Sequence, residues 1–528
     1  MINNFKDQLA SLSRRGFIRA AGGCSALTST AVMSSMLNLK ATHAAMSMQS
    51  NYEGYKAMVC VFLFGGNDSF NMLVPREDDE YSDYASIRGN PADGGLALAK
   101  EDLLPITSAA GRRFGIHPSM PEIKELYDDK ACAFVANVGS LIRPTTMSEY
   151  QSGLNRPLGL LSHADLIRHW QTSIPESRSQ VTGWAGRMAD LVTDETNNNP
   201  HMSMNFSVSG TNIFQTGRDV IPYVVHTGGA TLLNGYNGTN AQDRIYTRAT
   251  DGMLGQTYAD LLEKTHAKSR RTAVDAAIQF NNAINSVQLQ TEFPESYLGA
   301  QLKMIARTIG ARELLQQRRQ IFFVTVGGWD HHDEVLANHE RMFPDVSKSL
   351  KAFYDATVEL NTERDVVAFT ASDFGRTLSS NGRGSDHAWG GNQLAVGGTV
   401  NGGDVKGVYP DRLLSNDDLD TGRGRLIPTT GTDEYAFDIA NWFGIPNDSN
   451  MEAVLPNVRN FVSAGQSSKL ELFADRKIDL PGGFEPPPGG FPPPPPPGKP
   501  SNPSLPGTGG PGGPGGGGPG GGGPGGFG

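Results

Sequence analysis

The sequence predicts an α/β fold, a three-layer sandwich whose central sheet is mostly parallel and lies between two layers of helices. Four short, continuously apolar runs are each followed directly by a polar segment, a pattern typical of strands buried on both faces of a parallel sheet. A fifth and shorter run comes later in the chain. These runs cover residues 58–64, 131–136, 321–326, 366–370 and 394–396. Helical spacing of apolar residues between the runs fits a layered α/β domain.

Two segments show this helical spacing clearly. Apolar side chains in residues 343–360 repeat every three or four positions, and a helix there would bridge the third and fourth runs as a crossover. Ile123, Leu126 and Tyr127 have the same spacing ahead of the second run. We therefore expect helices before the second and fourth strands.

A long segment between the second and third runs departs from this alternation. Residues 197–255 are rich in turn-forming residues, with candidate strands at 206–209 and 221–225. Residues 258–319 are rich in Ala, Gln, Leu and Arg, which favour helices. The sequence thus predicts an insertion of helices and loops over about residues 197–319.

The first 45 residues predict a bacterial export signal of the twin-arginine (Tat) type. Arg14 and Arg15 precede a weakly apolar stretch over 20–39 and a small-residue cleavage region over 41–45. We therefore expect a periplasmic or secreted protein whose partner during export is the Tat translocon. No apolar run reaches the roughly 18–20 residues of a membrane span, so we expect no membrane-spanning segment.

The end of the chain differs in composition from the rest. Residues 481–528 contain 17 Pro and 21 Gly among 48 residues. A segment of this composition has too few apolar side chains to form a core. We expect residues 476–528 to be a disordered tail and residues 46–475 to form the α/β domain. The chain has 45 Lys and Arg against 55 Asp and Glu, a formal charge of −10. Without a basic cluster, nucleic-acid binding is not expected.

Acidic and imidazole side chains collect where the predicted strands end. In open α/β sheets, ligands bind outside the carboxyl ends of the strands. Carboxylates and imidazoles together suit a divalent transition metal such as Zn²⁺ or Mn²⁺. The side chains placed there are Asp68, Asp330, His331, His332 and Asp373, with His387 ahead of the fifth run.

These residues can be divided between two ions. Asp330 and His332 can supply two ligands from one loop, and His387 would complete a site with an open position. Asp68 and Asp373 would hold a second, bridged ion. The alternative is that both aspartates cap helices and that the histidines are core residues whose hydrogen bonds are satisfied.

Three further residues are candidates for the site, and each has both a functional and a structural interpretation. Arg376 either clamps an anionic group or forms a surface ion pair. His163, within Ser162-His-Ala-Asp165, belongs either to a catalytic site or to the structural framework. The hydroxyl of Ser69 lies either beside the metal ligand Asp68 or at a helix N-cap.

With these residues the chain resembles the DUF1501 family of exported bacterial proteins, usually placed in the alkaline phosphatase–sulfatase superfamily. The matching segments are 64–75, 114–118, 162–165, 182–187, 327–332, 372–377, 386–391, 424–429 and 442–444. The resemblance extends from the signal to about residue 465, and the tail lies outside it.

The resemblance implies an alkaline-phosphatase-like fold and assigns roles to the candidates. Metal ligands would be Asp68, Asp330, His332, Asp373 and His387. The nucleophile would lie where the second strand feeds a helix, which makes it Thr145, Thr146 or Ser148, with Ser69 as a more distant candidate. Alkaline phosphatases carry a histidine after the third-motif aspartate, and this chain has Phe374 there. A second ion would therefore lack one ligand.

Two functions follow as hypotheses. The first is an exported hydrolase of phosphate or sulfate esters that uses one or two divalent ions (Zn, Mn or Ca) on a small anionic substrate. The second is a non-catalytic exported binding or assembly protein on the same fold. Convergence of the metal ligands beside an accessible hydroxyl would favour the first hypothesis.

Overall fold

The computed structural model describes residues 52, 54–199, 201–414 and 418–473. All of them belong to one of the two units into which the chain divides, residues 1–476. The predicted export signal and the predicted Pro/Gly-rich tail lie outside the described residues. None of the helices in the described part of the chain is both long and apolar enough to cross a membrane.

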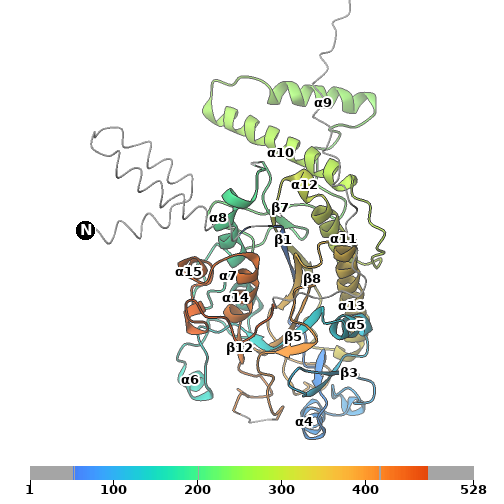
Figure 1. Cartoon of the computed structure of the whole chain (residues 1–528), viewed down its shortest axis with the longest axis vertical. Helices are drawn as coiled ribbons and strands as arrows, with labels where there is room; N and C mark the ends of the chain where they lie inside the picture. The colour runs from blue at the N-terminus through green and yellow to red at the C-terminus, as the bar shows by residue number, and fades with distance from the viewer. Residues whose placement is uncertain (1–51, 53, 200, 415–417, 474–528) are drawn as a thin grey trace, which may run out of the picture. The chain divides into compact units, whose positions relative to one another are not determined.

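A central nine-stranded sheet has the order β11-β5-β10-β9-β1-β8-β6-β7, with β12 beside β5. Figure 1 shows β1, β5 and β8 of this sheet between helices. Every pairing is parallel except those of β10, which is antiparallel to both β5 and β9. The predicted, mostly parallel sheet is confirmed. The strands are β1 Lys56–Leu63, β5 Cys132–Gly139, β6 Asn205–Ser207, β7 Tyr223–Val224, β8 Arg319–Val326, β9 Val366–Ser372, β10 Gly391–Val396, β11 Asp404–Lys406 and β12 Thr430–Gly431.

Side chains of β1 divide between two hydrophobic cores, one on each face of the sheet. Val59 and Val61 belong to one core, and Met58, Cys60 and Phe62 belong to the other, as alternation along a strand requires. Helices α5 (Pro121–Asp128), α11 (Tyr297–Gly310) and α13 (Val335–Glu359) contribute to the first core. Helices α7 (His163–Thr172), α8 (Trp184–Thr196), α14 (Thr432–Phe443) and α15 (Ser449–Val454) contribute to the second. The three predicted layers are therefore present.

A smaller, antiparallel sheet lies beside this sandwich and was not predicted. It pairs β2 (Leu73–Pro75) and β3 (Leu104–Thr107) with β4 (Arg113–Ile116), and α4 (Asp78–Arg88) follows β2. Strands of three or four residues are too short to show a sequence period. Short elements elsewhere are α6 Met147–Ser152, η1 Pro91–Asp93 and η2 Val458–Asn460.

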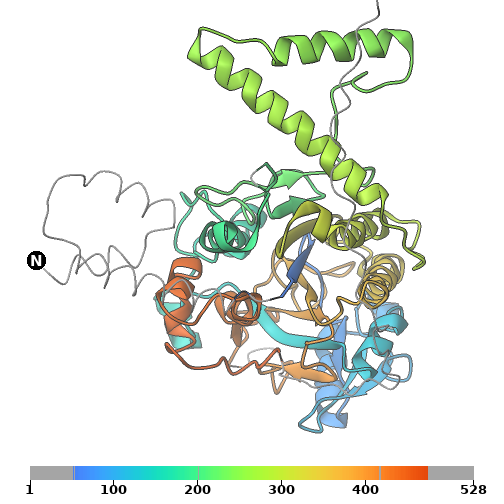
Figure 2. The ribbon, with the colours of Figure 1, turned by 45° about the horizontal axis from the view of Figure 1, so that its top comes forward.

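Four helices lie in the segment predicted as an insertion. They are α9 (Ala241–Leu254), α10 (Leu261–Asn285), α11 and α12 (Arg312–Leu315). Figure 2 shows α9 and the first part of α10 projecting away from the sandwich. Long helices after residue 258 were predicted, but α9 was not, because the Gly- and Asn-rich residues before it make the whole segment resemble a loop.

Candidate metal centre

The reversed direction of β10 brings distant residues to one edge of the sheet. Asp330 and His332 follow the carboxyl end of β8, and His387 precedes β10. Because β10 runs opposite to its neighbours, the start of β10 lies at the edge where the parallel strands end. His163 is the first residue of α7 and reaches the same place.

A glycine lets the loop after β1 lie directly against this group. Gly65 has φ +121°, and a Cβ atom built there would lie 2.3 Å from the backbone nitrogen of Asp330. The nitrogen of Trp329 also donates a hydrogen bond to the carbonyl of Phe64, at 3.0 Å. Only glycine permits this approach, so Gly65 fixes the backbone of Asp330 against the loop that follows β1.

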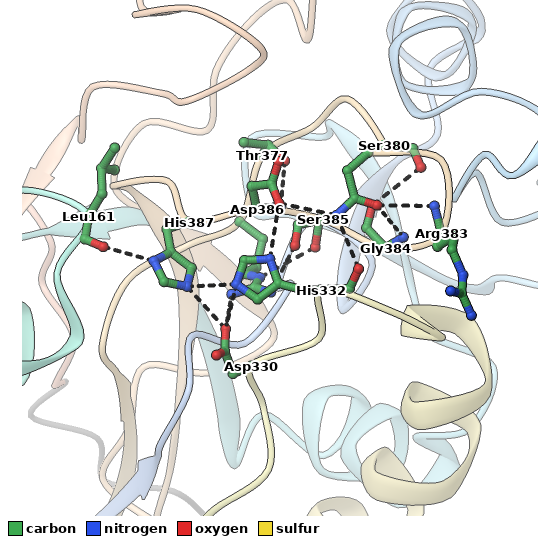
Figure 3. Close-up of polar contacts among 12 residues, drawn as sticks. Leu161, Asp330, His332, Thr377, Ser380, Arg383, Gly384, Ser385, Asp386 and His387 are labelled. Atoms are coloured by element: carbon green, nitrogen blue, oxygen red, sulfur yellow. Dashed lines mark hydrogen bonds and ion pairs between the residues drawn. The ribbon is translucent and has the colours of Figure 1, made fainter.

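Three imidazoles converge on the carboxylate of Asp330. Its Oδ1 lies 3.1 Å from Nε2 of His387 and 3.1 Å from Nε2 of His332, and its Oδ2 lies 3.3 Å from Nε2 of His163. The Nε2 atoms of His332 and His387 are 2.9 Å apart (Figure 3). Among the described residues, His163, Asp330 and His387 form a group of three whose ligand atoms all lie within 4.8 Å of one another.

The other ring nitrogen of each imidazole meets an oxygen. Nδ1 of His387 lies 2.8 Å from the carbonyl oxygen of Leu161. Nδ1 of His332 lies 3.0 Å from Oδ1 of Asp386. In the same way, Nδ1 of His163 lies 2.6 Å from Oδ2 of Asp373. Since a carbonyl and a carboxylate only accept hydrogen bonds, each Nδ1 donates its N–H there, and in a neutral imidazole this leaves the lone pair on Nε2.

Charges at the site agree with this assignment. Partial burial would raise the pKa of Asp330, yet the hydrogen bond from Arg376 and the positive charge of its guanidinium hold it at about 2. Burial lowers the pKa of His387, so its imidazole is neutral at pH 7. Burial likewise opposes ionisation of Asp386, whose hydrogen bonds from Asn381, Arg423 and His332 hold its pKa at about 2.

Lone pairs and a carboxylate that face one another repel unless a cation lies between them. Imidazole nitrogens and a carboxylate oxygen are ligands that Zn²⁺ accepts. Metal-binding histidines usually donate the other ring N–H to a carboxylate or a carbonyl, which is the arrangement of all three rings. The donor set therefore fits a divalent transition metal.

The group is also open to solvent. The side chain of Asp330 is 45% exposed, that of His332 46%, that of His163 34% and that of His387 23%. Catalytic zinc sites keep a position open for water or substrate, whereas structural sites are closed. This exposure allows an outside molecule to reach the centre.

Arg376 acts inside the site instead of facing solvent. Its guanidinium is fully buried, and Nη1 donates to Oδ1 of Asp330 at 2.7 Å. Nη2 donates to the carbonyl of Ser385 at 2.8 Å. The structure places Arg376 in a buried ion pair that orients Asp330, and not in the surface ion pair of the alternative interpretation.

Asp373 and Asp68, the two remaining predicted ligands, do not belong to this group of ligand atoms. Oδ2 of Asp373 contacts His163, and burial raises the pKa of the carboxyl, an effect that the hydrogen bond with His163 opposes. Asp68 is fully buried and pairs with Arg88 at 2.8 Å. Asp373 therefore orients the ring of His163, and Asp68 takes part in a separate ion pair.

The candidate nucleophiles have local hydrogen bonds in the structure. Thr146 is the N-cap of α6 and forms a capping box with Glu149, and the hydroxyl of Thr145 donates to the carbonyl of Arg143. Ser148 is exposed in the first turn of α6. Met147 and Tyr150 of α6 pack against Trp389, Leu141 and Ile427, which places the segment close in space to the loop that carries His387.

Ser69 and His331 have structural contacts. The hydroxyl of Ser69 is buried and accepts a hydrogen bond from the backbone nitrogen of Asn392 at 2.7 Å. His331 is 4% exposed, and its ring centroid lies 5.6 Å from that of His339 and 5.8 Å from that of Trp329. His331 is thus a buried histidine that packs against aromatic rings.

Sequence reasoning missed three groups of the site. Asp386 was noticed only as part of a motif, although its carboxylate beside His387 was a usable signal. The carbonyl of Leu161 has no signature in a sequence. Arg88, the partner of Asp68, lies in a helix far from any motif, and nothing in the sequence marks it.

Comparison with known proteins identifies the family. The chain belongs to the family described as "Protein of unknown function (DUF1501)", whose pattern matches residues 55–418. None of the curated proteins compared with the chain matches it.

Three solved structures illustrate the structural likeness. The first is Ps i-CgsB in complex with k-i-k-neocarrahexaose (9% identity, 76% of this chain and 74% of that chain, TM-score 0.32). The second is the lipoteichoic acid synthase LtaP from Listeria monocytogenes (8% identity, 82% and 81%, TM-score 0.26). The third is the PsFucS1 sulfatase from Pseudoalteromonas sp. (8% identity, 76% and 71%, TM-score 0.31).

Proposed function

We propose that this protein is an exported, metal-dependent hydrolase of phosphate or sulfate esters. One observation carries the proposal: three imidazoles, each with Nδ1 directed at an oxygen acceptor, turn Nε2 toward one ionised and exposed carboxylate. A divalent ion such as Zn²⁺, Mn²⁺ or Ca²⁺ bound there would stabilise negative charge on an ester oxygen and lower the pKa of a bound water. The superfamily resemblance supplies the substrate class.

The chain's own residues have distinct tasks in this proposal. His163, Asp330 and His387 hold the ion, and His332 lies close enough to join them. Arg376 fixes the orientation of Asp330 and keeps it ionised. Asp373, Asp386 and the Leu161 carbonyl fix the three rings. A small anionic ester would approach from the solvent side.

The attacking group is either a side-chain hydroxyl or a water. Thr145, Thr146 and Ser148 remain the proposed hydroxyls, since their segment packs beside the loop that carries His387. The local bonds of Thr145 and Thr146 favour water instead. A Thr145→Ala, Thr146→Ala, Ser148→Ala triple variant decides between them: turnover is lost if a hydroxyl attacks and retained if water does.

The test of the function combines metal removal with a panel of substrates. Purified protein is stripped with a chelator and reloaded with Zn²⁺, Mn²⁺ or Ca²⁺, and aryl phosphates and aryl sulfates are assayed. We expect turnover that disappears on chelation, returns with one of the ions and is absent in Asp330→Asn. A reloaded wild type that holds its ion and turns over neither class would contradict the hydrolase.

Such a result would leave the alternative, a non-catalytic exported binding or assembly protein. The observation that favours it is that the hydroxyls of Thr145, Thr146 and Ser69 make other hydrogen bonds. Export itself is tested separately with Arg14→Lys and Arg15→Lys together. We expect this variant to remain in the cytoplasm on cell fractionation while the wild type reaches the periplasm or medium. Equal export of both would contradict a Tat signal.

A further inference from the structure

A second carboxylate near this edge of the sheet is already neutralised inside the protein. Oδ2 of Asp68 accepts hydrogen bonds from Nη2 of Arg88 at 2.8 Å and from the hydroxyl of Ser385 at 2.9 Å. The side chains of Asp68 and Arg88 are both 0% exposed. Nη1 of Arg88 donates to the carbonyls of Thr377 at 3.1 Å and Leu378 at 3.3 Å. Hydrogen bonds from both Nη atoms therefore fix the guanidinium of Arg88 beside Asp68.

A second positive group lies close to the same pair. The hydroxyl of Ser385 that bonds Asp68 lies 3.4 Å from Nε of Arg376. A divalent cation added at Asp68 would thus enter beside one guanidinium, with a second one a single side chain away. Like charges at such distances in a buried site repel strongly. Asp330 meets a guanidinium too, that of Arg376, but its side chain is 45% exposed and faces imidazole nitrogens. Asp68 is 0% exposed and hydrogen-bonds to a guanidinium and a hydroxyl, which makes it a poor place for an ion.

An aromatic ring occupies the space beside the other buried carboxylate, Asp373. Phe374 is 3% exposed, and its ring centroid lies 4.8 Å from that of His163 and 4.5 Å from that of His387. The ring also packs on Gly66, where a Cβ atom would lie 2.4 Å from it. A phenyl ring offers no metal ligand, so this position contributes only packing.

We propose that the protein binds one ion, at His163, Asp330 and His387, and that Arg88 and Phe374 replace the second ion. The inference rests on the metal site of the proposed function, and it limits the number of ions bound there to one. Oδ1 of Asp68 and Oδ1 of Asp373 have no hydrogen-bond partner among the described residues, and these are the atoms a second ion would use. Yet among the described residues neither aspartate belongs to a group of three ligand atoms within 4.8 Å.

The test counts ions without measuring activity. Metal-free, full-length protein is titrated with Zn²⁺ by calorimetry, and the metal content is then measured after gel filtration. We expect one ion per chain in the wild type and none in Asp330→Asn. The double variant Asp68→Asn with Arg88→Met, which removes both charges together, should still bind one ion with unchanged affinity. Two ions in the wild type, falling to one in that double variant, would overturn the proposal.

A gain of binding tests the roles of Arg88 and Phe374. Arg88→Ala with Phe374→His removes the guanidinium and adds an imidazole beside Asp373, and we expect this variant to bind two ions. A count that stays at one in a folded variant would overturn the assignment of these two residues. One ion without ester turnover would support this inference and reject the hydrolase, whereas no ion at all would reject both.

Discussion

Asp330 and Asp68 each follow a strand of the same sheet, but they differ in what surrounds the carboxylate. The side chain of Asp330 is 45% exposed and faces three imidazole nitrogens. That of Asp68 is 0% exposed and faces a guanidinium and a hydroxyl. Each carboxylate also meets a buried guanidinium, that of Arg376 at Asp330 and that of Arg88 at Asp68. What distinguishes Asp330 is its exposure and the imidazole nitrogens around it, which attract a cation. Position at a strand end therefore does not define a metal ligand by itself.

The largest effect is expected when the exposed carboxylate loses its charge. Asp330→Asn keeps the shape of the side chain but removes the anion on which the three imidazoles converge. We expect Zn²⁺ affinity to fall by more than about 100-fold, a larger loss than that expected for an outer partner, as measured by calorimetric titration. His226→Ala, a substitution outside the site, serves as the control. Unchanged affinity in Asp330→Asn would remove Asp330 from the ligand set.

Breaking the buried ion pair of Asp68 and Arg88 should lower the free energy of unfolding instead of the metal affinity. Arg88→Ala leaves the carboxylate of Asp68 buried without its counter-ion, and such changes cost about 3–5 kcal/mol. We expect a lower unfolding midpoint in urea, with much of the loss recovered when Asp68→Asn is added. If Arg88→Ala unfolded at the wild-type midpoint, the pair would not be a buried ion pair in solution.

Replacing a carboxylate that orients one of the imidazoles should lower the metal affinity by an intermediate amount. Asp373→Asn removes the carboxylate that fixes His163. Loss of such a partner typically costs 10–100-fold in metal affinity, and we expect a loss of about that size with the number of bound ions unchanged. Asp386→Asn, which affects His332, provides a parallel case. A changed ion count in Asp373→Asn would make Asp373 a direct ligand.

A third buried carboxylate shows what happens without a guanidinium in contact. Oδ1 of Asp433 accepts a hydrogen bond from Ser173, and burial raises its pKa from 3.8 to about 7. The protonated form is therefore favoured by folding, and its stabilisation is lost as the pH rises from about 4 through 7. Relative to Asp433→Asn, the wild type should lose up to about 4 kcal/mol over this range. Thermal unfolding of both proteins at pH 4–8 measures the difference, and a constant difference would contradict the raised pKa.

Some of this arrangement could be predicted from sequence. The apolar runs identified β1, β5, β8 and β9 because strands buried on both faces are continuously apolar. Asp330, His332 and His387 could be selected because polar residues at strand ends meet at one edge. The reversed direction of β10, which makes this true for His387, has no signal in a run of three apolar residues.

The rest depends on contacts between residues far apart in the chain. Arg88 meets Asp68 only after α4 packs beside the small sheet, and the short strands of that sheet show no period. Sequence alone gave Asp68 and Asp330 the same role, since both follow strands and glycines. The difference between them comes from burial and from the arginine that each meets, and these are properties of tertiary packing.

Anomalous diffraction at the zinc absorption edge, from crystals of the reloaded protein, tests the central claim most directly. The account predicts one peak, bounded by Nε2 of His163, Nε2 of His387 and the carboxylate of Asp330, with no peak beside Asp68. A peak at Asp68, or the absence of any peak at Asp330 in protein that carries zinc, would contradict it.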